Sequence, residues 1–260
     1  VRFCLPLFPD ATIQFIPLIA VLSVISIIYG AMVALVQPDM KKLVAYSSVS
    51  HLGFVMLGLF ALNMQSIQGS IIQMVNHGLS TGGLFLLVGM IYERTHTRMI
   101  ADYGGIAKQV PVYATLLMIV VLSSLGLPGL NGFVGEFLIL LGAFQSGYIH
   151  WIFVVLATTG VILTAVYLLR WYQRFIFGSI TNKKNLLLKD LSLREMCVIL
   201  PIVFFIIWLG IYPKTFLDKT QASVYRLVRH IEYGEPIRWT GAEQSGEVKY
   251  VTETNKPDTP

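Results

Sequence analysis

Long apolar stretches, separated by short polar loops, run through most of this sequence. Asp, Glu, Lys and Arg are absent from 11–38, 43–92 and 196–213, and 109–169 holds only one of them, Glu136. About 20 apolar residues in a helix cross the roughly 30 Å hydrocarbon core of a bilayer. The pattern therefore predicts an all-α polytopic membrane protein. We expect helices at about 13–37, 43–62, 66–92, 150–177 and 192–212, with a further apolar region at 111–147.

The apolar region at 111–147 is too long for one ordinary span, because a single helix there would extend about 55 Å. Pro128 removes a helical hydrogen bond, and Gly129 and Gly132 add backbone freedom in the middle of the region. We therefore predict one discontinuous helix, which makes six transmembrane helices in all. Such breaks are tolerated at membrane depth where the freed backbone is buried in protein or lines a wet cavity, and in transporters they often mark the working site.

Basic residues gather in alternate loops. They are Lys41, Lys42, Arg94, Arg98, Lys108, Arg170, Arg174, Lys183, Lys184, Lys189 and Arg194, whereas the loops at 63–66 and 147–150 carry none. If 111–147 crosses the membrane once, all of these charges lie on one face, which the positive-inside rule makes cytoplasmic. A hairpin that crosses twice would divide them between both faces. The charge pattern thus favours the broken single span and places the C-terminal tail outside.

Composition supports a membrane protein. Hydrophobic residues make up 55% and charged residues 13% of the 260, whereas soluble domains carry about 25% charged residues. The net charge of +5 comes from loops without interleaved aromatic residues, so nucleic acid is not an expected partner. We interpret 1–212 as a transmembrane domain and 213–260 as a polar C-terminal tail, with a possible surface helix at about 214–231.

Glu136 is the leading candidate for chemistry. It stands alone in a long uncharged stretch and follows the Pro-Gly break by a few residues. Ionisable groups inside membranes are costly and usually mark functional sites. A partly desolvated carboxyl group there could exchange protons near neutral pH. The alternative is a residue at the level of the lipid headgroups, which the central position of Glu136 disfavours.

Two histidines and a lysine are further candidates. His51 and His77 each lie well inside a predicted span. Histidine titrates near neutrality and suits a proton relay; alternatively, each histidine is neutral and hydrogen-bonds two helices. Lys41 either serves the proton path or only sets the topology from a helix end. Residues 93–98 are interpreted as a solvated loop.

No signature of a redox cofactor site occurs in the sequence. It has no glycine-rich phosphate loop and no cysteine cluster, and Cys4 and Cys197 lie far apart without metal-ligand spacing. We therefore expect no metal, no cofactor and no catalytic redox residue in this chain.

Several segments resemble the antiporter-like subunits of NADH-quinone oxidoreductase, respiratory complex I. Residues 39–51 are similar to the junction of the family's ninth and tenth helices, 76–79 and 92–98 to the next segment, and 127–137 to its broken twelfth helix. The order and spacing match over about 1–180. The string at 92–98 favours the M-type branch, which includes the type 4 chains of mitochondria and the D-type chains of photosynthetic relatives.

The resemblance implies a subunit that couples quinone reduction by NADH to proton pumping. By position, Glu136 matches the family's proton-exit carboxylate, and His51 and His77 match its central histidines. Lys41 matches the lysine of its Asp-x-Lys motif. The chain looks like the C-terminal half of such a subunit, namely the second of two inverted five-helix repeats plus a final helix. The NADH, flavin, iron–sulfur and quinone sites are expected in other subunits.

The expected partners are the other membrane subunits of the respiratory complex, the lipid bilayer and protons, and the expected location is a bacterial inner membrane. Two alternatives share the same motifs, namely a multisubunit sodium/proton antiporter and a membrane-bound energy-converting hydrogenase. A purely structural membrane anchor would leave Glu136 and the broken helix unexplained.

Overall fold

The computed structural model describes residues 1–180 and 182–234, and it confirms the predicted all-α class. In these residues no β-strand occurs, and Asp39 and Met99 form an isolated bridge. The longest helices are α2 (Pro9–Leu35), α3 (Met40–Leu59), α4 (Met64–Thr95), α7 (Trp151–Ile176), α8 (Leu193–Ile211) and α9 (Lys214–Tyr233). The shorter ones are α1 (Cys4–Leu7), α5 (Pro111–Ser124) and α6 (Asn131–Gln145), with 3-10 turns η1 (Ile100–Asp102), η2 (Ile106–Lys108) and η3 (Lys183–Leu187).

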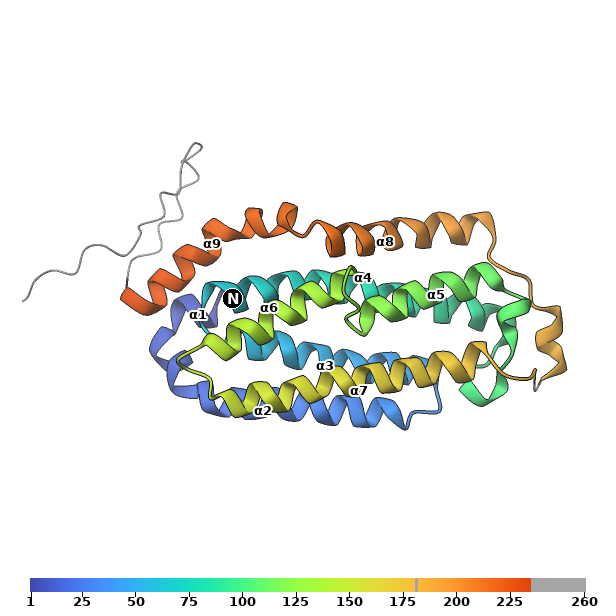
Figure 1. The fold of residues 1–260 in the computed structure, drawn as a ribbon, viewed down its shortest axis with the longest axis horizontal. Helices are drawn as coiled ribbons and strands as arrows, with labels where there is room; N and C mark the ends of the chain where they lie inside the picture. The colour runs from blue at the N-terminus through green and yellow to red at the C-terminus, as the bar shows by residue number, and fades with distance from the viewer. Residues whose placement is uncertain (181, 235–260) are drawn as a thin grey trace, which may run out of the picture.

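Five of these helices, α2, α3, α4, α7 and α8, are long and apolar enough to cross a membrane. The shorter apolar helices α5 and α6 follow one another along the bundle (Figure 1). Counted together as one broken span, they give the predicted set of transmembrane helices. The discontinuous helix expected at 111–147 is therefore confirmed.

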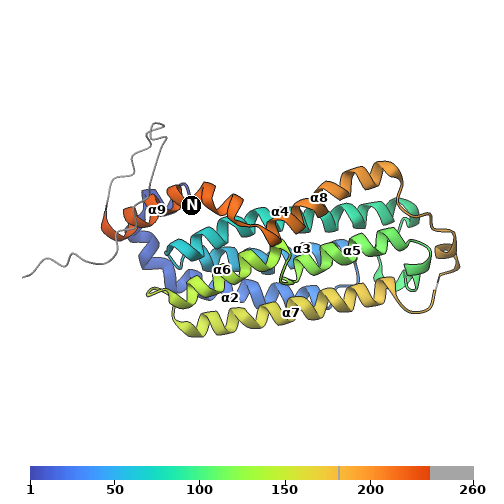
Figure 2. The ribbon, with the colours of Figure 1, turned by 45° about the horizontal axis from the view of Figure 1, so that its top comes forward.

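The long helices run roughly parallel and pack in a fixed order (Figure 1). Helix α2 contacts α3 and α7, α3 contacts α4, and α4 contacts α6. Helix α8 lies against α4 and α6 on the side of the bundle away from α2 and α7 (Figure 2). The α5–α6 break consequently faces the interior of the bundle on one side and α8 on the other.

The break between α5 and α6 is built from the residues that predicted it. The chain turns through Gly126 and Gly129, whose φ angles of 79° and 95° suit glycine and strain other residues. Gly132 lies in the first turn of α6, close to the last turn of α5. A Cβ atom on Gly132 would lie 2.1 Å from the carbonyl oxygen of Ser123, so only glycine permits this approach.

A polar layer divides the interior of the bundle into two apolar halves. On α3, Leu43 belongs to one apolar cluster and Phe54 to the other, with His51 between them. On α4, Leu84 belongs to the same cluster as Leu43, and Ile67 belongs to the same cluster as Phe54. The buried polar side chains between the clusters include Ser50, His51, Gln73, Asn76, Ser80, Ser123, Asn131 and Glu136. This layer lies near the middle of the helices, at the level of the α5–α6 break.

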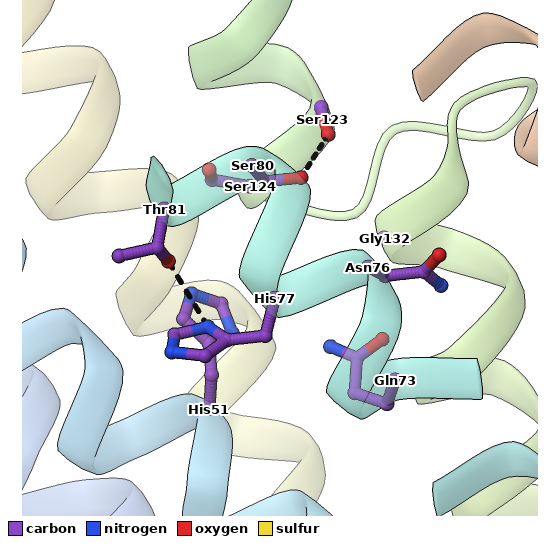
Figure 3. Close-up of a pocket in the computed structure, with 9 residues that line it drawn as sticks. All are labelled: His51, Gln73, Asn76, His77, Ser80, Thr81, Ser123, Ser124 and Gly132. Atoms are coloured by element: carbon purple, nitrogen blue, oxygen red, sulfur yellow. Dashed lines mark hydrogen bonds between the residues drawn. The ribbon is translucent and has the colours of Figure 1, made fainter. Parts of the chain in front are cut away.

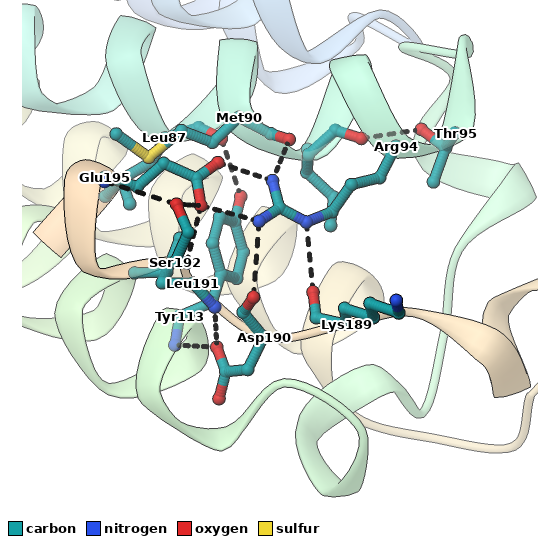
Figure 4. A network of polar contacts seen from close by, with 11 residues as sticks. Leu87, Met90, Arg94, Thr95, Tyr113, Lys189, Asp190, Leu191, Ser192 and Glu195 are labelled. Atoms are coloured by element: carbon teal, nitrogen blue, oxygen red, sulfur yellow. Dashed lines mark hydrogen bonds and ion pairs between the residues drawn. The ribbon is translucent and has the colours of Figure 1, made fainter.

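The end of α4 is tied to the segment that leads into α8, as Figure 4 shows. Arg94 donates from both terminal nitrogens to the two carboxylate oxygens of Glu195, each at 2.6 Å. It also donates to the backbone carbonyls of Lys189 and Asp190. The Asp190 carboxylate accepts the N–H groups of Val112 and Tyr113 and so caps α5.

The prediction of a solvated loop at 93–98 was therefore wrong for its first residues. Helix α4 continues to Thr95 and ends at His96, which has a left-handed conformation with φ 54°. The charge of Arg94 is held by a carboxylate that follows far along the sequence, and sequence spacing alone gave no sign of it.

Beyond the helix, burial raises the pKa of Tyr103 to about 12, so its hydroxyl keeps its proton and donates to the Thr97 carbonyl at 2.8 Å.

The whole stretch predicted as a surface helix at about 214–231 lies within α9. Its apolar side, with Val224, Leu227, Val228 and Ile231, is buried against the bundle near α1 and α4 (Figure 2). The placement of α9 at a membrane surface stays a prediction, as does the division into 1–212 and 213–260. The rest of the predicted tail, 235–260, lies outside the described residues.

Candidate functional site

The centre of the polar layer is a buried pair between α3 and α6. His51 Nδ1 lies 3.0 Å from Glu136 Oε1, and the two side chains are only 5% and 6% exposed. Gln73 on α4 donates from Nε2 to the same oxygen at 3.3 Å. The pair can hold its proton on either partner, as imidazolium with carboxylate or as neutral imidazole with carboxylic acid. Three helices therefore meet at one buried carboxylate, which bonds a histidine and an amide.

The second carboxylate oxygen of Glu136 faces the α5–α6 break. A Cβ atom on Gly126 would lie 3.0 Å from Glu136 Oε2. Because Gly126 has no side chain, the carboxylate can approach the turn that follows α5. The helix break thus leaves space for a titratable group at membrane depth, where such a group is otherwise costly.

His77 on α4 stands next to His51, as Figure 3 shows. The two ring centroids are 5.6 Å apart and the rings are tilted by 43°. His77 Nδ1 lies 3.0 Å from Thr81 Oγ1, one helical turn further along α4. The two histidines and Glu136 consequently form a continuous row across α4, α3 and α6.

A second group of polar side chains ties the break to α4. Asn76 Nδ2 donates to the Asn131 carbonyl at 2.6 Å, and Asn131 Nδ2 donates back to the Asn76 carbonyl at 3.4 Å. Ser123 Oγ lies 2.5 Å from both Ser80 Oγ and Asn131 Oδ1. These bonds give the buried polar side chains partners and hold the end of α5 and the start of α6 to α4.

A small cavity separates the histidine row from this second group. Its lining residues are His51, Gln73, Asn76, His77, Ser80, Thr81, Ser123, Ser124 and Gly132 (Figure 3). The cavity has a volume of about 10 Å³, roughly the space of one water molecule. Gln73 Oε1, Asn76 Oδ1 and Ser124 Oγ have no hydrogen-bond partner among the described residues. Three acceptor oxygens at this cavity suit a bound water that contacts both groups.

The structure brings together three of the four residues predicted from sequence for proton transfer, Glu136, His51 and His77. Lys41 lies apart from them. Its side chain is exposed in the first turn of α3, where its backbone N–H donates to Asp39 Oδ1 at 2.8 Å. Along the helix it is about 15 Å from His51.

Gln73 and Asn131 are site residues that the sequence reasoning did not single out. Both are amides within otherwise apolar helices, and Gln73 is one helical turn from His77 on the same side of α4. Polar amides at membrane depth often bond helix to helix, so their presence was the available signal. Within 1–180 and 182–234, no group of three or more His, Cys, Asp or Glu is placed to hold a metal ion.

Comparison with known proteins gives consistent relatives. The family model described as "NADH:quinone oxidoreductase/Mrp antiporter, TM" matches residues 1–164. NADH-ubiquinone oxidoreductase chain 4 of Marchantia polymorpha is 46% identical over 231 residues, which are 88% of this chain and 46% of the relative. NADH-quinone oxidoreductase subunit M of Rhodobacter capsulatus is 45% identical over 88% of this chain and 44% of its own length.

Two solved structures contain chains with a similar fold. A chain of respiratory complex I from Thermus thermophilus superposes with a TM-score of 0.80 at 36% identity, over 87% of this chain and 48% of that one. A chain of the Mrp complex from Dietzia sp. DQ12-45-1b shares the fold, with a TM-score of 0.76 at 18% identity over 84% and 48% of the two chains. The chain thus spans less than half the length of these relatives. Its match to the family model over 1–164 shows that the chain belongs to the NADH:quinone oxidoreductase/Mrp antiporter transmembrane family.

Proposed function

We propose that this chain forms part of a proton-translocating membrane subunit of an NADH-quinone oxidoreductase. The observation that carries the proposal is the buried His51–Glu136 pair, which faces the α5–α6 break at the middle of the bundle. The names of the relatives at 45–46% identity support the redox assignment. The similarity to an Mrp complex lies at 18% identity and supports the fold alone.

In the proposed mechanism, a proton moves along the row from His77 to His51 to Glu136. His51 bonds Glu136 through Nδ1, so a proton gained elsewhere on the imidazole ring allows the Nδ1 proton to pass to the carboxylate. His77, whose ring contacts His51, is placed to supply that proton, through a water in the adjoining cavity. Gln73 donates to the carboxylate and stabilises its charged form. Once Glu136 is protonated, both Glu136 and His51 are neutral, so the charge attraction between them is lost.

Release of the proton requires a second arrangement in which Glu136 binds it less tightly. The α5–α6 break is the element suited to this change, because its backbone is held by side chains rather than by a continuous helical ladder. Quinone reduction elsewhere in the complex would shift the charges that face the row. In this proposal Lys41 lies at the basic end of the bundle and influences the row by its charge. It does not itself pass the proton along the row.

The wider assignment follows from the same proposal. The chain would carry no redox reaction of its own, and the NADH, flavin, iron–sulfur and quinone sites would belong to other subunits. The end of the bundle with the basic residues Lys41, Lys108 and Lys183 would face the cytoplasm of a bacterial cell. The end that carries α9 would face the outside.

The direct test replaces Glu136 by Gln in the full-length subunit of the assembled complex. The amide keeps the shape of the side chain and cannot exchange a proton, so we expect fewer protons moved per NADH oxidised in closed vesicles. The matched control is Glu93→Gln, which neutralises an exposed carboxylate on α4. An unchanged proton-to-NADH ratio in the Glu136→Gln complex would refute the assignment of the carboxylate.

The same vesicles distinguish the two families of complexes. Proton uptake that starts with NADH and stops with a quinone-site inhibitor supports the respiratory assignment. Proton movement driven by a sodium gradient, with no response to NADH, would instead place the chain in an antiporter, with the buried pair retaining its role.

A further inference from the structure

A pair of arginines on α7 faces a groove at the basic end of the bundle. Arg170 and Arg174 are exposed and lie one helical turn apart. The groove has a volume of about 550 Å³ and runs between these arginines and the end of α2 at Leu35, Val36 and Pro38. A second hollow of about 380 Å³, lined by Phe177 and Gly178, adjoins the same two arginines. Both arginines therefore line two hollows at the surface.

The carboxylates near this groove are already engaged. Asp39 accepts two N–H groups at the start of α3 and lies 3.4 Å from Arg98. Asp102 accepts a hydrogen bond from Thr97 at 2.5 Å. In the described residues, no acidic side chain forms an ion pair with Arg170 or Arg174. Like charges four residues apart repel one another on a helix, so this arrangement favours an added anion.

The surface that continues from the groove is apolar. On α2, Met32 and Tyr29 are 57% and 63% exposed, and on α7, Val166 and Ile162 are 46% and 64% exposed. Helices α2 and α7 pack side by side along this surface (Figures 1 and 2). A ligand that fills the groove and follows this surface must be anionic at one end and apolar along the rest of its length.

We propose that Arg170 and Arg174 bind the phosphate of an anionic phospholipid, whose acyl chains lie along α2 and α7. Guanidinium groups pair with phosphate oxygens through two parallel hydrogen bonds. Basic pockets between transmembrane helices are suited to anionic headgroups. The position at the end of both helices matches the headgroup level of a bilayer. An acidic segment of a protein partner would satisfy the arginines but would leave the apolar surface below them uncovered.

The test uses the assembled complex with its full-length subunit, in vesicles of phosphatidylcholine. A phosphatidylglycerol probe with a photoreactive acyl chain is added, and labelled peptides are identified by mass spectrometry. We expect label on the C-terminal halves of α2 and α7, displaced by unlabelled phosphatidylglycerol. Millimolar inorganic phosphate should leave the label in place, since free phosphate lacks the acyl chains.

Variants connect the label to the two arginines. The Arg170→Gln/Arg174→Gln complex should need about 30-fold more probe for half-maximal labelling, given the attraction of two basic residues at a charged surface. The control Lys183→Gln/Lys184→Gln removes the same charge from exposed residues of η3 outside the groove, and should label as the unaltered complex does. Arg170→Lys/Arg174→Lys keeps the charge and should label at an intermediate concentration if the first variant assembles poorly.

Three results would overturn the proposal. Equal labelling by a photoreactive phosphatidylcholine would show that the phosphate charge is not recognised. An equal loss of labelling in the lysine control would assign the effect to overall charge. Cross-linking of this surface to another subunit in place of the lipid would identify a protein as the occupant.

Discussion

At the scale of residues, the polar side chains at membrane depth fall into two chemical kinds. Glu136, His51 and His77 can gain or lose a proton, whereas Asn76 and Asn131 cannot. The two amides hold the broken backbone to α4 by bonds in both directions. A titratable group can change its charge without loss of the fold only if other residues keep the backbone in place. We therefore propose proton transfer for the first kind and support of the break for the second.

Asn131→Ala tests this division. The substitution removes the acceptor of Ser123 Oγ and the donor to the Asn76 carbonyl, both buried. Leaving buried polar groups without partners costs about 1–3 kcal/mol, so we expect a lower free energy of unfolding for the full-length subunit in detergent, followed by circular dichroism. Gln14→Ala, at an exposed position of α2, is the matched control. Equal stability of both variants would contradict the supporting role of Asn131.

At the scale of elements, the break depends on how closely α6 begins beside the end of α5. Part of this was predictable, since Pro128 and the glycines around it interrupt an otherwise continuous apolar helix. The pairing of Glu136 with His51 was not, because α3 and α6 are distant in sequence and only the packing of three helices fixes their contact. The prediction that Arg94 lies in a solvated loop was wrong for the same reason. Its partner Glu195 lies in the first turn of α8, which is distant in sequence.

Gly132→Ala should disturb the break. The added Cβ atom would lie 2.1 Å from the Ser123 carbonyl oxygen, so α5 and α6 must separate. Overpacking of this kind costs about 1–3 kcal/mol, and separation of the helices should also reduce proton transfer by Glu136. Gly82→Ala on α4 has no atom within 4 Å of the new Cβ and should be neutral or slightly stabilising. Similar losses of proton uptake in both variants would refute the importance of this contact.

The clamp between Arg94 and Glu195 is best measured by a double-mutant cycle. Both side chains are partly exposed, at 21% and 16%, so solvent screens part of their attraction. The bidentate geometry still favours a coupling free energy of about 1–2 kcal/mol between Arg94→Gln and Glu195→Gln. Additive effects of the two substitutions on unfolding would show that the helices α4 and α8 are held by apolar packing alone.

At the scale of the whole molecule, the bundle has a basic end, an apolar half, a polar layer, a second apolar half and the end covered by α9. The apolar halves keep water and ions from the polar layer except along specific side chains. This order places the buried polar site between two apolar halves and about equally far from both ends of the bundle. The two ends of the bundle also differ, because Lys41, Lys108 and Lys183 lie at one end and α9 lies at the other.

The orientation predicted from the basic loops can be tested by labelling single cysteines in the full-length subunit. Cys4 and Cys197 are both exposed and are first replaced by Ser to remove the background. A membrane-impermeant maleimide added to intact cells should label Glu232→Cys, on an exposed part of α9, and spare Lys183→Cys. Inverted vesicles should give the reverse result, because the two positions lie at opposite ends of the bundle. Labelling of both cysteines from the same side would contradict the crossing by α8, the helix that separates the two positions. The reverse pattern in cells would contradict the predicted orientation, and a double crossing of 111–147 would produce it.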